Sequence, residues 1–407
     1  MRRKMGISQT SSAPDGDGFY TPPSSFSGTH GDVIWSRLLT GPAALESAGK
    51  NELVLYRSEA ADGAPIAVSG IIALPRRKAP ADGYPVVSWA HGTLGLGGKW
   101  APSRDSAAIA AELPEHHFIN QAPHGLLNAL LDRGFAIVMT DYEGMGTPGP
   151  HPYLLGTSEA RGVLDIVRAA RQMHPALSNR LAVVGHSQGG QAALFAAHYA
   201  PTWTPELDLR GVAALAPASH VKDSLIGGSR YPQPHPGFAF TPLMLTGAIV
   251  GARASGGKID PQQVLSDKAF GLFQSSGSKC RVELSQPGSW GGLLGTEQFR
   301  GDLSGQPNDD QKEFLRQLDL TNPALPIKCP VRLAHAQPDT RIGINNTNKL
   351  VEELGALGND LTYRIYPAVA NPSALGAHFG VLDTDAPALA AWLEQQMGHK
   401  TRRPKVQ

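Results

Sequence analysis

An apolar segment that runs straight into a glycine-flanked serine constrains this chain most. Residues 181–184 are all apolar and predict a buried strand, and Gly185-His-Ser-Gln-Gly189 follows directly. The Ala-rich stretch at 191–199 then predicts a helix. Strand, sharp turn and helix around a G-x-S-x-G pentapeptide are typical of a nucleophile elbow, which makes Ser187 our candidate nucleophile. The alternative is a buried strand that ends in a Gly-rich turn, since the bare pentapeptide also occurs by chance.

Predicted strands and helices alternate along much of the chain. An Asp62-Gly63 turn between two apolar segments predicts an antiparallel hairpin near the start. The alternation that follows favours an α/β fold, with a mostly parallel twisted sheet flanked by helices. Strands are predicted at 52–58, 64–74, 84–91, 135–140, 181–184, 211–217, 331–336 and 361–366. Helices are predicted within 116–133 and at 158–173, 191–199, 345–357 and 387–397, with Ser158 and Asp385 as N-caps of two of them.

The alternation stops between residues 221 and 328, where the chain is rich in Gly, Pro, Ser and Gln. We expect an inserted lid or cap at the carboxyl ends of the parallel strands, where such folds keep their sites. The alternative is an ordinary helical subdomain with its own core. Five apolar residues of the insertion are expected to line an acyl pocket: Phe238, Phe240, Leu243, Met244 and Leu245. The predicted domains are a disordered segment at 1–18, a core at 19–220 and 329–398, the cap at 221–328 and a basic tail at 399–407.

A serine nucleophile needs a histidine as its base, and the histidine needs a carboxylate that orients it. In an α/β fold with this elbow, the partners follow in the order Ser, acid, His. Asp339 lies three residues beyond a predicted strand, and His378 follows the last predicted strand. Asp360 precedes a strand, and Asp383 and Asp385 come after the histidine. Ser187, Asp339 and His378 are therefore the predicted triad.

Acyl transfer also needs N–H donors for the oxyanion. One should be the backbone N–H of Gln188, directly after the nucleophile. The other should be that of Thr93, in the Gly-rich loop at 91–98, although the same loop could be only a flexible connection. His186 is expected to point away from the site, and His335 is expected to be an ordinary strand residue. The histidines show no metal-ligand spacing, so we predict no metal site.

Composition excludes some function classes. Lys and Arg total 36 against 35 Asp and Glu, so no polyanionic partner such as nucleic acid is expected. No run of 18 apolar residues predicts a membrane span. The two cysteines, Cys280 and Cys329, could form a disulfide or stay as buried thiols. The basic start at 1–5 lacks a following apolar segment, so the localisation stays undetermined: cytoplasmic, or exported with the signal absent from this chain.

Several motifs occur together along the chain: Phe19–Pro23, Ser69-Gly70, Ala90–Thr93, Asp141–Gly146, His151-Pro-Tyr153 with Ser158, 165–171, the Gly185–Gly190 elbow and the large insertion. Taken together, these motifs resemble the secretory-lipase family of α/β-hydrolases, the group of Candida lipase A-type enzymes, in a bacterial form. The resemblance implies that a small-molecule ester is hydrolysed by a Ser-Asp-His triad without a cofactor, and the apolar insertion favours a hydrophobic acyl or aryl group. Contact with a lipid interface and the oligomeric state stay open.

Three other functions use a chain of this kind. An acyltransferase has the same machinery, with an alcohol or amine in place of water. A serine peptidase of the same fold usually needs a site for a charged peptide terminus, and the sequence shows none that we can identify. A binding protein without activity typically loses a triad member, whereas this chain keeps Ser187, Asp339 and His378 in order.

Overall fold

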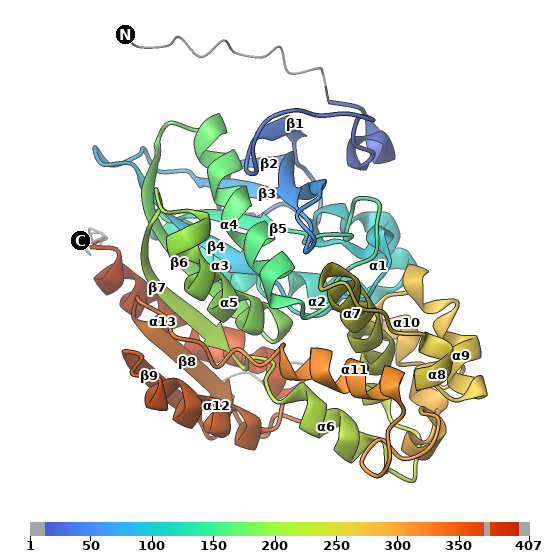
Figure 1. Ribbon diagram of the computed structural model, residues 1–407. Helices are drawn as coiled ribbons and strands as arrows, with labels where there is room; N and C mark the ends of the chain where they lie inside the picture. Colours follow the sequence, from blue (N-terminus) through green and yellow to red (C-terminus); the bar gives the residue numbers. More distant parts are fainter. Residues whose placement is uncertain (1–12, 370–374, 399–407) are drawn as a thin grey trace.

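The computed structural model describes residues 13–369 and 375–398, and its centre is a nine-stranded sheet with helices on both faces (Figure 1). The strand order is β1-β2-β3-β5-β4-β6-β7-β8-β9. The strands are β1 Val33–Leu38, β2 Ala48–Glu59, β3 Pro65–Pro75, β4 Tyr84–Ala90, β5 Ala136–Thr140, β6 Leu177–His186, β7 Asp208–Leu215, β8 Val331–Ala336 and β9 Leu361–Tyr366. The α-helices are α1 Ala107–Glu112, α2 Pro114–Gln121, α3 His124–Asp132, α4 Gly156–Met173, α5 Gln188–Trp203, α6 Val221–Gly228, α7 Phe240–Ala254, α8 Pro261–Val264, α9 Asp267–Phe273, α10 Arg281–Leu284, α11 Asp309–Asp319, α12 Ile344–Ala356 and α13 Ala377–Gln396.

The sheet is antiparallel at its start and parallel beyond it. β1 pairs with β2, β2 with β3, and β3 with β5 in antiparallel fashion. Every later pair, from β5–β4 to β8–β9, is parallel. Asp62 and Gly63 lie in the turn between β2 and β3, and Gly63 has a φ of +85°, which a glycine adopts without strain. The predicted hairpin and the mostly parallel sheet are both confirmed, whereas β1 was not predicted.

Two helical layers cover the sheet. One apolar cluster joins the sheet to α4, α5 and α12, through residues such as Val163, Leu194 and Leu350. A second cluster, with Leu127 and Leu389, joins the other face to α3 and α13. Because both faces are covered, every residue of β4 and β5 is buried. This burial explains why these two strands consist mostly of apolar residues instead of alternating with polar ones.

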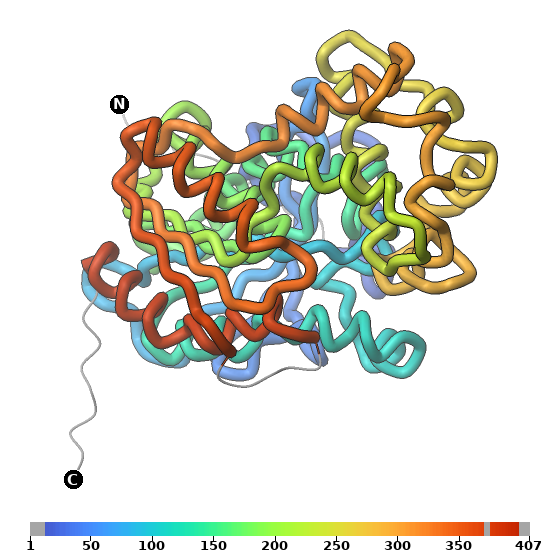
Figure 2. The backbone as a smooth tube through the Cα atoms, turned by 90° about the horizontal axis from the view of Figure 1, so that it is seen from below, coloured from blue at the N-terminus to red at the C-terminus, as the bar shows by residue number. Residues whose placement is uncertain are grey.

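Residues 221–328, which we call the cap, are helical and share an apolar cluster with a few residues of the core. The cap contains α6 to α11, and Figure 2 shows its segments gathered at one end of the molecule. Four of the residues expected to line an acyl pocket are instead buried in the cap's cluster, and Phe240 packs against it. That prediction is therefore wrong. Most apolar side chains of the cap helices pack against one another, and the core contributes Leu96, Tyr153, Leu154 and Ala218 to the same cluster. The four buried residues are Phe238, Leu243, Met244 and Leu245.

The cap meets the core at the loop that follows β4. Gly95 and Cys280 form an isolated antiparallel β-bridge, and the Arg281 N–H donates to the Leu94 carbonyl at 2.7 Å. A Cβ on Gly95 would lie 2.4 Å from the Cα of Cys280, so this close approach requires glycine. The cap is thus fixed to the loop that carries Thr93, at the carboxyl end of β4.

One segment of the cap resembles a membrane span by length and composition alone. Residues 236–254, which include α7, have a mean hydropathy of 1.2, and 61% of the segment is buried inside the protein. It is the single such segment in the described part of the chain. Burial of this extent is what the core helix of a folded cap requires.

Two helices begin earlier than the sequence indicates. α13 begins at Ala377, ten residues before Pro387, so that proline lies inside the helix and Asp385 is not an N-cap. α4 begins at Gly156, so Ser158 lies inside it and bonds the Glu143 carboxylate instead of capping. In both cases packing of an apolar face against the sheet extends the helix beyond the point that local signals suggest.

The ordered part of the chain also begins earlier than predicted. Residues 16–20 form a short 3₁₀ helix, held because Phe19 and Tyr20 are buried. The predicted disordered segment therefore cannot extend to residue 18. Its first part, residues 1–12, and the predicted basic tail at 399–407 lie outside the described residues. Cys280 and Cys329 are both buried free thiols.

Candidate active site

Ser187 occupies a tight turn between β6 and α5. Its φ of 59° and ψ of −119° are unusual for a residue with a side chain, as a nucleophile elbow requires. The flanking glycines are sterically necessary. A Cβ on Gly189 would lie 1.9 Å from the Ala90 carbonyl oxygen, and one on Gly185 would lie 1.9 Å from that of Gly189. The predicted strand, turn and helix around Ser187 are confirmed.

The structure brings His378 and Asp339 together. His378 Nδ1 lies 2.7 Å from Asp339 Oδ2, and both side chains are buried. The other carboxylate oxygen, Oδ1, accepts the backbone N–H groups of Arg341 at 2.8 Å and Ile342 at 3.0 Å. These bonds fix the carboxylate, so His378 keeps its Nδ1 proton toward Asp339 and leaves Nε2 free to act as a base.

Burial and hydrogen bonding set the charges of this pair. Burial alone would raise the pKa of Asp339, but the neighbouring His335 and His378 side chains bring the pKa below its usual value. The carboxyl is therefore ionised at neutral pH. Burial also lowers the pKa of His378, although the hydrogen bond to Asp339 opposes this effect. His378 is therefore neutral at pH 7, the state that a general base needs.

The lowered pKa of His378 predicts how activity depends on pH. Because the neutral imidazole is the active form, kcat/KM should stay on its plateau as the pH falls through 6.5, the usual value for histidine. It should fall only at lower pH, when His378 takes up a proton. A profile of kcat/KM from pH 4 to pH 8 measures this. An acid limb with its midpoint at or above 6.5 would contradict the assignment.

His186, which precedes Ser187 in the sequence, contacts His378. Its Nε2 lies 2.7 Å from the carbonyl oxygen of His378, and the two rings are 4.5 Å apart. The expectation that the elbow turns His186 away is therefore wrong, because the end of β6 lies against the first turn of α13. Within the described residues no hydrogen bond joins the Ser187 hydroxyl to His378. The acid and the histidine are thus in contact, with the segment that carries the serine beside them.

Two backbone N–H groups near Ser187 are available to an oxyanion. Gln188 is the first residue of α5, and Gly92 lies so close that a Cβ there would be 3.5 Å from Ser187 Cβ. Among the described residues neither the Gln188 nor the Thr93 N–H donates to another protein group. The Thr93 hydroxyl lies 2.8 Å from the Tyr153 hydroxyl. The loop that carries Thr93 thus lies beside the serine, as predicted.

His335 was expected to be an ordinary strand residue and does lie in β8, but its contact with Asp339 was not predicted. Its Nε2 lies 3.3 Å from Asp339 Oδ2, although outside hydrogen-bond geometry, and its Nδ1 lies 2.8 Å from the Thr347 hydroxyl. The residue is fully buried at the end of β8. The i, i+4 spacing of His335 and Asp339 across the end of a strand is the signal that could have indicated this contact.

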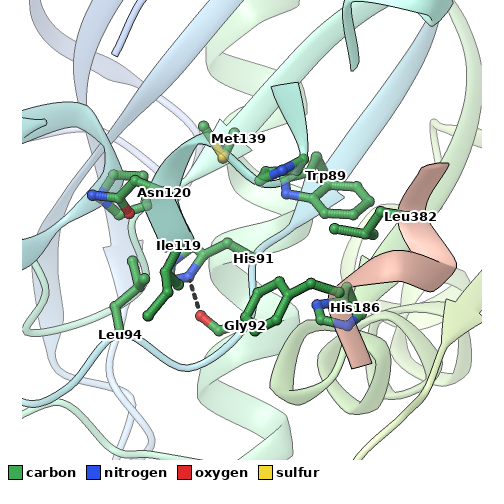
Figure 3. Close-up of a pocket in the computed structure, with 12 residues that line it drawn as sticks. Trp89, His91, Gly92, Leu94, Ile119, Asn120, Met139, His186 and Leu382 are labelled. Atoms are coloured by element: carbon green, nitrogen blue, oxygen red, sulfur yellow. Dashed lines mark hydrogen bonds between the residues drawn. The ribbon is translucent and has the colours of Figure 1, made fainter. Parts of the chain in front are cut away.

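A small apolar cavity lies next to the site. Its volume is about 20 Å³, room for one water molecule, and His186 and Gly92 form part of its wall (Figure 3). In the described structure, Trp89 Nε1 and Asn120 Oδ1 are buried without a partner, and both residues line the cavity. The remaining walls are mainly apolar and come from His91, Leu94, Pro102, Ile119, Pro123, Met139, Phe379 and Leu382.

The described residues contain no group of three or more His, Cys, Asp or Glu side chains that could hold a metal ion. Asp141, in the motif that follows β5, is fully buried and accepts hydrogen bonds from Ser69 and Ser103. It therefore holds the loops together and lies apart from the His378–Asp339 pair.

Comparisons with known proteins agree with this fold. Residues 111–225 match the family model described as secretory lipase. The fold matches the crystal structure of Candida antarctica lipase A with a TM-score of 0.70 at 19% identity, over 95% of this chain and 86% of that one. The chain has the α/β-hydrolase fold, and part of its sequence is similar to the secretory lipases. The predicted fold and the resemblance are both confirmed.

Two curated relatives are more similar in sequence but match only part of the chain. Lipase 5 of Candida albicans is 28% identical over 204 residues, which is 48% of this chain and 42% of that protein. A Mycobacterium tuberculosis protein named a probable inactive lipase is 26% identical over 213 residues, or 50% of this chain and 46% of that protein. The chain therefore spans less than half the length of either relative, and activity must be argued from the site.

Proposed function

We propose that this α/β-hydrolase is a serine carboxylic-ester hydrolase. The observation that carries the proposal is the 2.7 Å hydrogen bond between His378 and Asp339, formed next to a serine in the elbow conformation. A histidine held by a buried carboxylate is the arrangement that activates a serine hydroxyl. Because one relative is named as inactive, the fold alone does not establish activity, and the proposal depends on this chain's own residues.

The reaction would follow from these positions in two halves. Ser187 attacks the ester carbonyl while His378 takes its proton and passes it to the leaving alcohol, with Asp339 stabilising the imidazolium. The N–H groups of Gln188 and Thr93 donate to the oxyanion as the tetrahedral intermediate forms. Water then attacks the acyl-enzyme with His378 as base, and the acid is released.

The surroundings of the serine favour a hydrophobic acyl or aryl ester. Ser187 is 8% exposed and His378 4% exposed, so a bound ester would be largely enclosed. The cavity beside His186 has room for only one water molecule, but the side chains that surround it are mainly apolar, and apolar surroundings favour an acyl or aryl group over a charged one. Because the cap is fixed to the loop that carries Thr93, we propose that the cap acts as the lid of this site.

Hydrolysis of p-nitrophenyl esters from acetate to palmitate tests this function. The proposal predicts steady release of p-nitrophenol, and the chain length with the highest kcat/KM then separates an esterase from a lipase. Repeating the assay with an added alcohol shows whether water or the alcohol takes the acyl group. If no ester in the series is turned over, the hydrolase proposal fails.

A further inference from the structure

One segment of the chain contacts both candidate oxyanion donors. Residues 151–159, which we call the brace, connect the loop after β5 with the first turn of α4. From this segment the Tyr153 hydroxyl lies 2.8 Å from the Thr93 hydroxyl. The Gln188 side-chain amide donates to Glu159 Oε1 at 2.6 Å and lies 3.0 Å from His151 Nε2. The brace therefore links two residues that are 95 positions apart in the chain.

The hydrogen bonds of the brace are mutually consistent. His151 Nδ1 lies 2.9 Å from the Glu143 carbonyl oxygen, so Nδ1 carries the proton and Nε2 is an acceptor. The Gln188 amide thus donates one hydrogen to His151 and the other to Glu159. Burial lowers the pKa of His151 to about 4, which keeps the ring neutral in this role. Both hydrogens of the Gln188 side chain are therefore engaged.

Glu159 is an unusual carboxyl because no cation among the described residues lowers its pKa. Its Oε1 accepts the Gln188 amide and the Leu154 N–H at 2.9 Å, as a carbonyl oxygen would. Its Oε2 is buried and has no partner among the described residues. Burial raises the pKa of Glu159 to about 8, so the group is protonated at neutral pH, with the proton on Oε2.

The cap packs against one side of the brace. A Cβ on Gly247 of α7 would lie 2.0 Å from the Tyr153 carbonyl oxygen, so the helix backbone lies directly against the brace. On the core side, the Gln191 amide donates to the Leu154 carbonyl at 3.0 Å. With protein on both sides, the brace has little freedom to shift. A fixed support of this kind is what preorganised oxyanion donors need.

We propose that Tyr153, His151 and Glu159 are positioning residues that hold the two oxyanion donors, Thr93 and Gln188, in place for the reaction. The inference rests on the proposed function, because it assigns these residues to the oxyanion site of that reaction. Tyr153 orients the Gly-rich loop through Thr93. His151 and the uncharged Glu159 fix Gln188 at the start of α5, and a negative charge on Glu159 would oppose the developing oxyanion.

Two conservative variants test the brace. Tyr153→Phe removes only the hydroxyl, and we expect kcat to fall about tenfold to a hundredfold with KM within about twofold, since the donors act in the transition state. The matched control is Tyr56→Phe, which removes another buried hydroxyl, 2.7 Å from Thr140 and away from the site. This control should keep wild-type kcat. Thermal unfolding of both variants shows whether they are equally folded.

The second variant, Glu159→Gln, replaces the protonated carboxyl with an uncharged amide of nearly the same shape. In the wild type, kcat should fall as the pH rises through about 8 and Glu159 ionises. The variant should lack this alkaline fall, so the ratio of its kcat at pH 9 to its kcat at pH 7 should be about one, whereas the wild-type ratio should be well below one. The titratable groups around Glu159 do not share this range, because His151 has a lowered pKa and burial raises the pKa of Tyr142 and Tyr153.

The outcomes separate this inference from the proposed function. If the wild type hydrolyses esters but Tyr153→Phe keeps full kcat, the proposed role of the brace is wrong and the esterase proposal stands. The same conclusion follows if Glu159→Gln keeps the alkaline fall in kcat. A lower kcat shared equally by Tyr56→Phe would also overturn the brace, since it would indicate a general loss of packing. A wild type with no ester hydrolysis would overturn both.

Discussion

Replacing Ser187 with alanine is expected to lower kcat for ester hydrolysis by about 10⁶-fold, since a serine hydrolase without its nucleophile keeps only weak residual catalysis. KM should change little, because the small substitution leaves the substrate's surroundings in place. The measurement is p-nitrophenol release by the variant and the wild type under identical conditions. Folding should be unaffected, because alanine removes a single oxygen atom.

A second buried serine provides the control for this result. Ser88 lies in β4 and donates to the Val163 carbonyl at 2.7 Å, away from the site. Ser88→Ala should cost about 1 kcal/mol of stability and keep wild-type kcat in the folded protein. If Ser187→Ala retains more than about one per cent of wild-type kcat, Ser187 is not the nucleophile.

The largest effect on stability is expected at Asp385. Arg332 donates to both Asp385 oxygens, at 2.6 and 2.5 Å, and the Tyr366 hydroxyl donates to Oδ1 at 2.6 Å. The Arg332 and Asp385 side chains are 4% and 0% exposed. Asp385→Asn leaves Arg332 buried without a counter-charge, so we expect the free energy of unfolding to fall by about 3–5 kcal/mol. Urea unfolding measures this loss.

Asp383 offers a matched control for Asp385, since it lies on the same helix but is exposed. Asp383→Asn should change stability by less than about 0.5 kcal/mol. At urea concentrations too low to unfold it, Asp385→Asn should keep wild-type kcat. Asp339→Asn should instead lose about 10⁴-fold in kcat, without a comparable fall in the free energy of unfolding. If Asp385→Asn unfolds like the wild type, the account of this ion pair is contradicted.

The sheet could be predicted because its strands carry local signals. The strands at 331–336 and 361–366 coincide with β8 and β9, and the Asp62-Gly63 hairpin joins β2 and β3. The elbow was predictable for the same reason, since strand, glycines and helix follow one another directly. Loop positions after strands placed Asp339 and His378, because the carboxyl ends of parallel strands share one edge of the sheet.

The rest depended on contacts between distant parts of the chain. α13 begins at Ala377 because Val381 and Leu382 pack on the sheet, and no local cap signals this start. The helices of the cap supply most of each other's apolar contacts, so Phe238 is buried in their cluster, whereas the sequence suggested that it lines an acyl pocket. Glu159 gives no sign in the sequence of its contact with Gln188, since only the fold brings the two together.

The most direct test of the central claim is reaction with a fluorophosphonate, followed by peptide mass mapping. Such reagents form a covalent adduct with a serine that a neighbouring histidine activates. Our account predicts one adduct per chain, on Ser187, with the labelling rate falling in acid as His378 takes up a proton. No adduct, or an adduct on another residue that persists in Ser187→Ala, would contradict the account.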